Sequence, residues 1–332
     1  MRTVEAKLEA AREDLANHDG VLIAFSGGVD SSVVAALAHD ALGERAVACT
    51  AKSETLPAAE LEEARRTATE IGIRHEIVEF SELESDAFVE NDADRCYHCR
   101  TMRLGRMLET ARELGIETVC DGTNADDPGA GHRPGLRAVE ELEIHSPLLV
   151  HDISKSEVRE IADRYGLSVT AKPSMACLSS RIPTGLSVTE DRLDRIERAE
   201  AVLRSLGFEG FRVRDHDGLA RIEIAPAQLE DALQVQFVET VRDPLLDLGF
   251  DHVTLDLHGY RTGSVSPAGT DESAREDTEG SGSSTNSASS SNTTSGTNST
   301  SIESSNSTSI ESSSETEFDP ETHTTDDRHL SK

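Results

Sequence analysis

The sequence predicts an α/β fold in which a doubly wound parallel sheet is followed by a smaller α+β domain and a disordered tail. The first observation is a regular alternation of strand and helix patterns, which is typical of a parallel sheet with helices on both faces. The second is the uninterrupted apolar run at 21–25, because strands buried on both faces read as continuous hydrophobic stretches. The third is the near disappearance of apolar residues from about Val265 onward, where Ser, Thr, Asn, Glu and Gly dominate.

The individual elements follow from the spacing of apolar residues, which recur every three or four positions in helices and form short runs in strands. In the first domain we expect helices at 3–17, 31–41, 57–71 and 101–114, and strands at 21–25, 45–50, 74–80 and 118–120. In the second domain we expect helices at 189–206 and 226–247, and strands at 211–215, 220–224 and 252–258. We place the boundary near residue 180, so that the predicted domains are 1–180 and 181–264.

The segment 265–332 is predicted to be a disordered, acidic, Ser/Thr-rich tail. It contains NSTSIESS twice in tandem, at 298–305 and 306–313, which indicates low complexity rather than a folded repeat. A segment with so few apolar residues cannot bury enough surface to offset the loss of chain entropy on folding.

The charge balance excludes several classes of function. The 332 residues include 63 Asp and Glu against 32 Lys and Arg, a formal net charge of −31. A broad basic face for nucleic acid is therefore not expected, because phosphate binding needs Lys and Arg to displace counterions. No apolar run reaches the ~20 residues that span a bilayer, and the start is charged rather than signal-like. We expect a cytoplasmic protein that binds neither nucleic acid nor membranes.

The composition also predicts a halophilic protein. Only five of the 32 basic residues are Lys, and aromatic residues make up 3% of the chain. An acidic surface with few lysines suits concentrated salt, where screening weakens the repulsion between like charges. An acidic surface for a partner protein is the alternative interpretation.

A glycine- and serine-rich loop between the first strand and the next helix is predicted to bind phosphate. Glycines let an anion approach the backbone, and the N-terminus of a helix presents free N–H groups to it. An aspartate here can hold Mg²⁺, and the Lys of a Walker A loop is absent. A serine-rich helix cap without a ligand is the alternative. The loop comprises Ser26, Gly27, Gly28, Val29, Asp30, Ser31 and Ser32.

The five cysteines are an odd number, and with no export signal expected they favour metal or catalytic use over a disulfide framework. Cys96 and Cys99 form a CxxC pair of soft ligands, and Cys177 is a distant third that completes a cluster with one open iron. Zinc with His98 as fourth ligand is the competing site, and ordinary buried thiols are the third possibility. The remaining two, Cys49 and Cys120, lie in or beside predicted strands and are expected in the core.

Further motifs occur in a fixed order after the loop. They read Arg95-Cys96-Tyr97-His98-Cys99, Asp121-Gly122-Thr123-Asn124-Ala125-Asp126-Asp127, Ala176-Cys177-Leu178-Ser179-Ser180-Arg181 and Arg212-Val213-Arg214. Together with SGGVDSS, these motifs resemble those of the LarE-type ATP-dependent sulfur transferases, which are PP-loop enzymes of the adenine nucleotide α-hydrolase superfamily. The resemblance covers residues 5–263 and excludes the tail.

The resemblance implies an ATP-dependent sulfurtransferase of nickel-pincer nucleotide cofactor biosynthesis. Such an enzyme adenylates a carboxylate of pyridinium-3,5-biscarboxylic acid mononucleotide and installs sulfur to give a thiocarboxylate. The matching cysteine is Cys177, which donates its own sulfur in single-cysteine members of the family. Members with three cysteines are instead thought to hold a [4Fe–4S] cluster. Because Cys96 and Cys99 are also present, the chain resembles this three-cysteine branch. The resemblance also implies a homo-oligomer.

The same resemblance, together with the residue types, assigns the remaining site residues. ATP and Mg²⁺ are expected at the loop and at Gly122, Thr123, Asn124 and Asp126. Arg212 and Arg214 alternate along a strand, so their guanidiniums share a face and can grip a substrate phosphate; a solvated charged face is the alternative. The further candidates for substrate binding are Arg181, Glu200, Glu223 and Asp231.

Cys177 is the predicted catalytic residue. An acyl-adenylate is electrophilic at carbon, and a thiolate or a cluster-bound sulfide is the matching nucleophile. Nearby cations, Lys172 and Arg181, are expected to favour the thiolate. Two alternatives remain at this stage: another PP-loop enzyme, such as a tRNA thiolase or an amide-forming synthetase, and a nucleotide sensor without catalysis.

Overall fold

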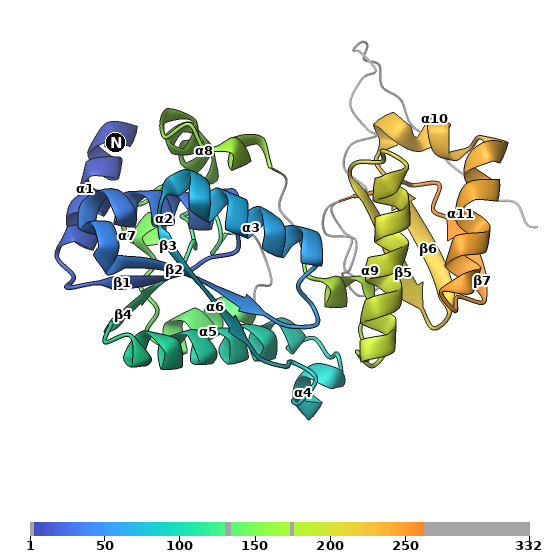
Figure 1. Ribbon diagram of the computed structural model, residues 1–332, viewed down its shortest axis with the longest axis horizontal. Coiled ribbons are helices and arrows are strands. Elements are labelled where there is room, and N and C mark those ends of the chain that lie inside the picture. The colour runs from blue at the N-terminus through green and yellow to red at the C-terminus, as the bar shows by residue number, and fades with distance from the viewer. Residues whose placement is uncertain (1–2, 130–133, 173–175, 262–332) are drawn as a thin grey trace, which may run out of the picture. The chain divides into compact units, whose positions relative to one another are not determined.

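The first part of the chain forms a parallel sheet, which confirms the predicted fold class (Figure 1). A computed structural model describes residues 3–129, 134–172 and 176–261. The sheet has four strands in the order β3-β2-β1-β4. Val21 pairs with Ala46 on one side and with Thr118 on the other, so β1 is central. The strands are β1 (Val21–Ala24), β2 (Ala46–Lys52), β3 (Arg74–Glu79) and β4 (Thr118–Cys120).

Helices bury both faces of this sheet, as the apolar run at 21–25 predicts. Ile23 of β1 packs in one core cluster with Val33 of α2, whereas Leu22 packs in another with Leu104 of α5. Figure 1 shows α2 and α3 on one side of the sheet and α5 on the other. The helices are α1 (Val4–Ala16), α2 (Val29–Leu42), α3 (Ala58–Ile71), α4 (Asp86–Val89), α5 (Arg95–Glu113), α6 (Pro134–Glu141), α7 (Pro147–Val150) and α8 (Lys155–Arg164).

Helix α5 begins six positions earlier than the apolar spacing predicts, at Arg95 instead of residue 101. The first turn is polar and has no apolar period, but Asp92 accepts a hydrogen bond from the Asp94 backbone N–H at 2.8 Å and shapes the start of the helix. Cys96 and Cys99 therefore lie in the first turns of a helix, where positions three apart share one face.

A second sheet has the order β5-β6-β7 and its own apolar core. Strands β5 and β6 are antiparallel, whereas β6 and β7 are parallel. Leu203 of α9 packs with Val213 and Ile222 of the sheet in this core. The elements are α9 (Glu190–Ser205), β5 (Phe211–His216), β6 (Leu219–Ile224), α10 (Leu229–Ala232), α11 (Val235–Asp247) and β7 (His252–Leu255).

Two predictions for this part of the chain are wrong in detail. The helix expected at 226–247 is broken into a 3₁₀ turn at 226–228 and the helices α10 and α11, because Gln234 is extended. Strand β7 ends at Leu255, because Asp256 turns the chain by accepting the backbone N–H groups of His258 and Gly259.

Two sequence predictions remain untested by the structure. The tail at 265–332 lies outside the described residues. The domain boundary near residue 180 stays a prediction. Within the part of the chain that the structure describes, no helix is both long and apolar enough to cross a bilayer.

Candidate active site

The loop after β1 lies at the carboxyl end of the central strand and leads directly into α2. Gly27 has a φ of +68°, and a Cβ atom at this position would lie 2.8 Å from the Ala64 Cα atom of α3. Only glycine therefore fits between the loop and α3. Gly28 caps α2 without a side-chain hydrogen bond, which leaves the first N–H groups of a 14-residue helix for an anion.

The predicted loop serines differ in their surroundings. Ser31 Oγ accepts a hydrogen bond from the Ser26 backbone N–H at 3.2 Å and donates one to the Gly28 carbonyl at 3.1 Å. Both Ser26 and Ser31 line the adjacent cavity. Ser32 is fully buried, and its hydroxyl has no hydrogen-bond partner among the described residues. Ser26 and Ser31 thus shape the loop, whereas Ser32 packs beneath it.

A second loop, at 121–127, packs over the start of α2 and contacts Asp30. A Cβ atom on Gly122 would lie 2.8 Å from the Ser31 backbone N atom, so this close approach requires glycine. Asn124 Nδ2 donates to Asp30 Oδ1 at 3.1 Å, and Lys155 Nζ donates to Asp30 Oδ2 at 2.5 Å. The structure thus brings the predicted nucleotide residues of both loops to one place and adds Lys155, a cation that the sequence motif did not assign.

Asp126 and Thr123 have structural partners at this loop. Asp126 Oδ2 accepts the Lys155 backbone N–H at 2.8 Å and so fixes the start of α8. Thr123 Oγ1 donates to Asp121 Oδ2 at 2.6 Å. Arg100 of α5 also contacts the Asp121 carboxylate, which joins the loop to the helix that carries the CxxC pair.

A cavity of about 720 Å³ opens beside the two loops and reaches the cysteines. A smaller cavity of about 160 Å³ is lined by both the loop and Cys177. The loop and Cys177 therefore border shared space. Residues of the predicted site that line the larger cavity are Ser26, Asp30, Ser31, Cys96, Cys99, Gly122, Thr123, Asn124, Asp126 and Cys177.

Backbone contacts hold Cys177 at this wall. The Leu178 backbone N–H donates to the Thr55 carbonyl at 2.9 Å, which ties the segment to the loop between β2 and α3. Cys177 Sγ lies 3.1 Å from Ser179 Oγ. The fully buried Arg181 donates to the Cys177 carbonyl at 2.8 Å and pairs with Glu200 at 2.9 Å. The guanidinium thus orients the cysteine backbone.

The cation Lys172, also predicted near the cysteine, pairs with Glu60 at 2.8 Å and with Glu63 at 3.1 Å. It lines the smaller cavity together with Cys177. Its charge is therefore shared with two carboxylates.

A buried carboxylate, Glu82, holds the CxxC helix beside the Cys177 segment and was missed by the sequence motifs. Cys99 Sγ donates to Glu82 Oε1 at 2.8 Å, and Arg103 Nε donates to the same oxygen at 3.1 Å. Burial alone would raise the pKa of Glu82, but Arg103 and hydrogen bonds from Cys99, Thr55 and Ser53 hold it below the ordinary value. Burial raises the pKa of the Cys99 thiol, and the Glu82 charge adds to this effect. The only local feature of the sequence that could have indicated Glu82 is its position just after the predicted strand at 74–80.

The three candidate cysteine ligands border one cavity but do not form a ready-made site for a single ion. Cys96 is exposed, and Cys99 and Cys177 are half-buried. Among the described residues, the only three His, Cys, Asp or Glu ligand atoms that lie within 4.8 Å of one another belong to a different cluster. A zinc ion bound by these cysteines and His98 would need four ligand atoms around one point. The other two thiols, Cys49 and Cys120, are buried as predicted.

The arginines of β5 are buried and already in contact with protein groups. Arg214 forms two hydrogen bonds to Glu223, at 2.6 and 2.9 Å, and donates to the Ser180 carbonyl at 3.0 Å. Arg212 donates to the Tyr260 hydroxyl at 3.3 Å, and burial lowers its pKa. Both residues are buried, which excludes the alternative that they form a solvated, charged face of the strand. Asp231 is exposed on α10 and lines neither cavity.

Comparisons with known proteins agree with this geometry. The family model for asparagine synthase matches residues 3–126. An uncharacterized protein of Synechocystis is 42% identical over 262 residues, which are 79% of this chain and 97% of the relative. The pyridinium-3,5-bisthiocarboxylic acid mononucleotide synthase of Lactiplantibacillus plantarum is 37% identical over 80% of this chain and 94% of its own length. A tRNA-specific 2-thiouridylase of Parvibaculum lavamentivorans is 28% identical over 70% of this chain and 65% of its own. The chain therefore belongs to the family of LarE-type ATP-dependent sulfur transferases.

Proposed function

We propose that this protein adenylates a carboxylate of pyridinium-3,5-biscarboxylic acid mononucleotide and replaces the adenylate with sulfur, giving the thiocarboxylate of the nickel-pincer cofactor pathway. One observation carries the proposal: the phosphate-type loop and Cys177 line the same cavity. The name of the Lactiplantibacillus plantarum relative, which describes a bisthiocarboxylic product, supports the choice of substrate. The acidic charge balance disfavours the tRNA thiolase alternative.

The first step is the activation of the carboxylate by ATP. A substrate carboxylate oxygen attacks the α-phosphorus, and pyrophosphate leaves with the electrons of the broken P–O bond. The N-terminus of α2 and the cation Lys155, which contacts Asp30 in the loop, would stabilise the charge that develops on the pyrophosphate. Asp30 offers the oxygen ligand that Mg²⁺ prefers, and bound Mg²⁺ would neutralise phosphate charge.

The second step is the transfer of sulfur. A sulfur nucleophile beside Cys177 forms a bond to the acyl carbon while AMP leaves with the electron pair of the C–O bond. The bond between this sulfur and its carrier then breaks, with the electron pair staying on sulfur, and the thiocarboxylate is released. Holding both reactants in one cavity replaces a bimolecular encounter with a positioned reaction. Arg181 keeps the cysteine backbone in place for this attack.

The source of the sulfur is proposed to be a [4Fe–4S] cluster. Cys96, Cys99 and Cys177 would hold it, and its open iron would carry the sulfur to be transferred. Three thiols around one cavity suit a cluster, whose ligands bind separate irons, better than a single zinc ion. Anaerobic purification with iron and sulfide analysis tests this proposal. A loss of ~34 Da at Cys177, one H₂S departing with the thiolate sulfur, would instead identify the cysteine itself as the donor.

The substrate phosphate is proposed to bind Arg212 and Arg214 on β5. The hydrogen bond from Arg214 to the Ser180 carbonyl brings these arginines close to the segment that carries Cys177. Glu223 holds the Arg214 guanidinium in a buried pair, and Glu200, which pairs with Arg181, accepts the backbone N–H of Val213 between the two arginines. A direct contact of Asp231 with substrate stays a prediction.

The deciding experiment separates adenylation from sulfur transfer. In Cys177→Ser we expect pyrophosphate release that depends on the biscarboxylate substrate, but no thiocarboxylate, because a serine hydroxyl can neither hold the cluster nor supply sulfur itself. Asp30→Ala is the complementary variant and should lose pyrophosphate release. Product formation is followed by mass spectrometry and ATP-to-AMP conversion by chromatography. Loss of adenylation in Cys177→Ser, or ATP cleavage without substrate, contradicts the proposal.

The biological setting is proposed as a homo-oligomer in the cytoplasm of a salt-adapted cell. The excess of acidic over basic residues and the five lysines support salt adaptation. Light scattering gives the oligomeric state. Activity that rises from dilute to molar KCl is expected, and activity that falls with KCl contradicts the salt proposal.

A further inference from the structure

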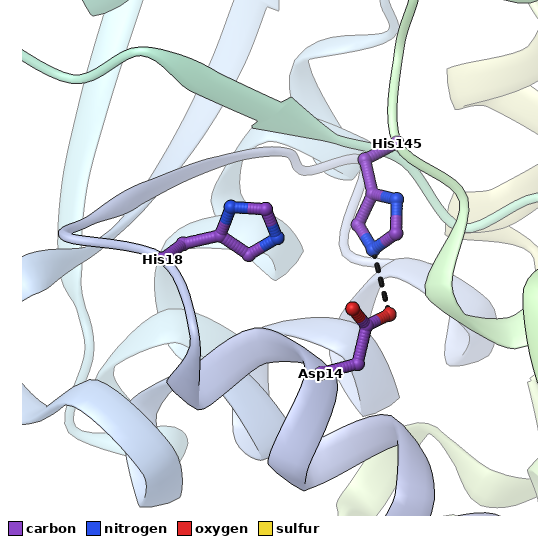
Figure 2. A group of neighbouring side chains, drawn as sticks. All are labelled: Asp14, His18 and His145. Carbon is purple, nitrogen blue, oxygen red and sulfur yellow. Dashed lines mark hydrogen bonds and ion pairs between the residues drawn. The ribbon is translucent and has the colours of Figure 1, made fainter.

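A cluster of one carboxylate and two imidazoles lies outside the active site. Asp14 belongs to α1, His18 follows that helix, and His145 follows α6. Each offers one potential ligand atom, and the three atoms lie within 4.8 Å of one another. Figure 2 shows the three side chains directed toward one another, with His145 bonded to Asp14. All three residues are half-buried, and none lines either cavity.

The backbone fixes this arrangement. The His145 N–H donates to the Val119 carbonyl at 2.9 Å, and the Asp121 N–H donates to the His145 carbonyl at 2.9 Å, so His145 extends the edge of the sheet beside β4. Helix α1 packs against α7, which begins two residues later, at Pro147. Residues 131 positions apart are therefore brought together by regular structure.

Hydrogen bonds further orient the side chains. Asp14 Oδ2 contacts His145 Nε2 at 2.9 Å and His151 Nε2 at 3.0 Å, so a third imidazole reaches the same oxygen. His18 Nδ1 lies 3.0 Å from Thr118 Oγ1. When Nδ1 donates to this hydroxyl, the lone pair of His18 lies on Nε2. A ligating histidine is typically held in this way by a second group at its other nitrogen.

We propose that Asp14, His18 and His145 bind one divalent transition-metal ion such as Zn²⁺, while His151 holds the Asp14 carboxylate from outside this group. Imidazole and carboxylate are the donors of zinc sites, and three protein ligands leave one position for water. Mg²⁺ prefers an all-oxygen shell and is not expected to bind here. The ion joins α1 to the edge of the sheet. Ser146 then connects the site to the cavity wall by donating to Asp121 at 2.6 Å.

The test uses the full chain with Cys96, Cys99 and Cys177 changed to Ser, because thiolates also bind Zn²⁺ and Co²⁺. Co²⁺ is titrated and followed by its visible absorption, and Zn²⁺ is then added to displace it. We expect one ion per chain. His145→Ala should lower the affinity at least ~10-fold, and Thr118→Val, which removes only the orienting hydroxyl, about 10-fold.

His258→Ala is the matched control, because His258 also lies beside a carboxylate, 3.6 Å from Asp256, but is 79% exposed and belongs to no group of three ligand atoms among the described residues. It should bind the ion as the parent does. Zn²⁺ should raise Tm in the parent and in this control but not in His18→Ala. Circular dichroism verifies that each variant is folded, and His18→Ala, outside any helix, carries the test if His145→Ala unfolds. Equal Zn²⁺ affinity in the parent and in folded His18→Ala, or equally tight binding of Mg²⁺, overturns the proposal.

Discussion

The loop after β1 and the arginines of β5 are both predicted to bind phosphate, yet the structure prepares them differently. The loop leaves the N-terminus of α2 without a side-chain cap beside a cavity. On β5, in contrast, Arg214 is 6% exposed and already paired with Glu223. The loop is thus preorganised for an anion. The guanidinium of Arg214, in contrast, could bind a ligand only while it also keeps its hydrogen bonds to Glu223 and Ser180.

This difference separates binding groups that cost little stability from groups whose removal weakens the fold. Breaking a buried ion pair leaves an uncompensated charge and costs about 3–5 kcal/mol. A free helix N-terminus needs no partner in the empty protein, because water solvates it. Substitutions in the two regions should therefore change activity and stability in different proportions.

The largest expected effect is on Arg214→Ala. The variant removes both Arg214 hydrogen bonds to the buried Glu223, which keeps Arg221 as a partner at 2.7 Å, so the free energy of unfolding should fall by about 3 kcal/mol, measured by urea denaturation. Arg198→Ala is the matched control, because Arg198 and its partner Asp194 are both about 60% exposed. The control should change stability by less than about 1 kcal/mol. Equal stabilities of the two variants would remove the distinction between the regions.

A smaller effect is expected for Gly27→Ala in the loop. A φ of +68° disfavours any residue with a Cβ atom, and the new methyl would press on Ala64. The strain should cost about 1–3 kcal/mol and move the loop, so ATP binding should weaken more than stability falls. Calorimetric titration with ATP and urea denaturation measure the two effects. Gly43→Ala has a φ of +58° with open space around it and serves as the control for strain alone; ATP binding as weak in the control as in Gly27→Ala would contradict the argument.

The sequence was informative where the signal is contiguous. The heptapeptide at 26–32 follows an apolar strand, so its place at the sheet edge could be predicted from local pattern alone. The burial of Ser32 could not be predicted in this way, because it depends on how α2 packs in the fold. Glu82 was missed because Cys99 and Arg103 reach it from 17 and 21 positions away and no motif encodes that contact.

The helical elements follow the same rule. The break at Gln234 escaped prediction because the apolar spacing continues through it, although the backbone is extended there. Arg181 was assigned to substrate, yet Glu200, 19 positions away, holds it in the core. Local patterns predicted the elements, whereas long-range contacts decide how charged residues are partnered.

The smallest expected effect concerns the acid stability conferred by Glu82, a buried charge beside Cys99 that, like Arg214, is already paired within the protein. The pKa of Glu82 is lower in the folded protein than in the unfolded chain, so its stabilisation is present above the unfolded pKa and is lost as the pH falls through the folded pKa.

Ser53→Ala removes a 2.8 Å hydrogen bond to this carboxylate and should raise the folded pKa. Acid unfolding, followed by circular dichroism from pH 7 downward, should then begin at a higher pH than in the parent, with a cost of about 1 kcal/mol at neutral pH. Ser205→Ala, whose hydroxyl bonds only to the Val202 carbonyl among the described contacts, should leave the acid transition unchanged. If acid unfolding begins at an equally raised pH in both variants, the protonation of Glu82 does not determine the pH at which the protein unfolds.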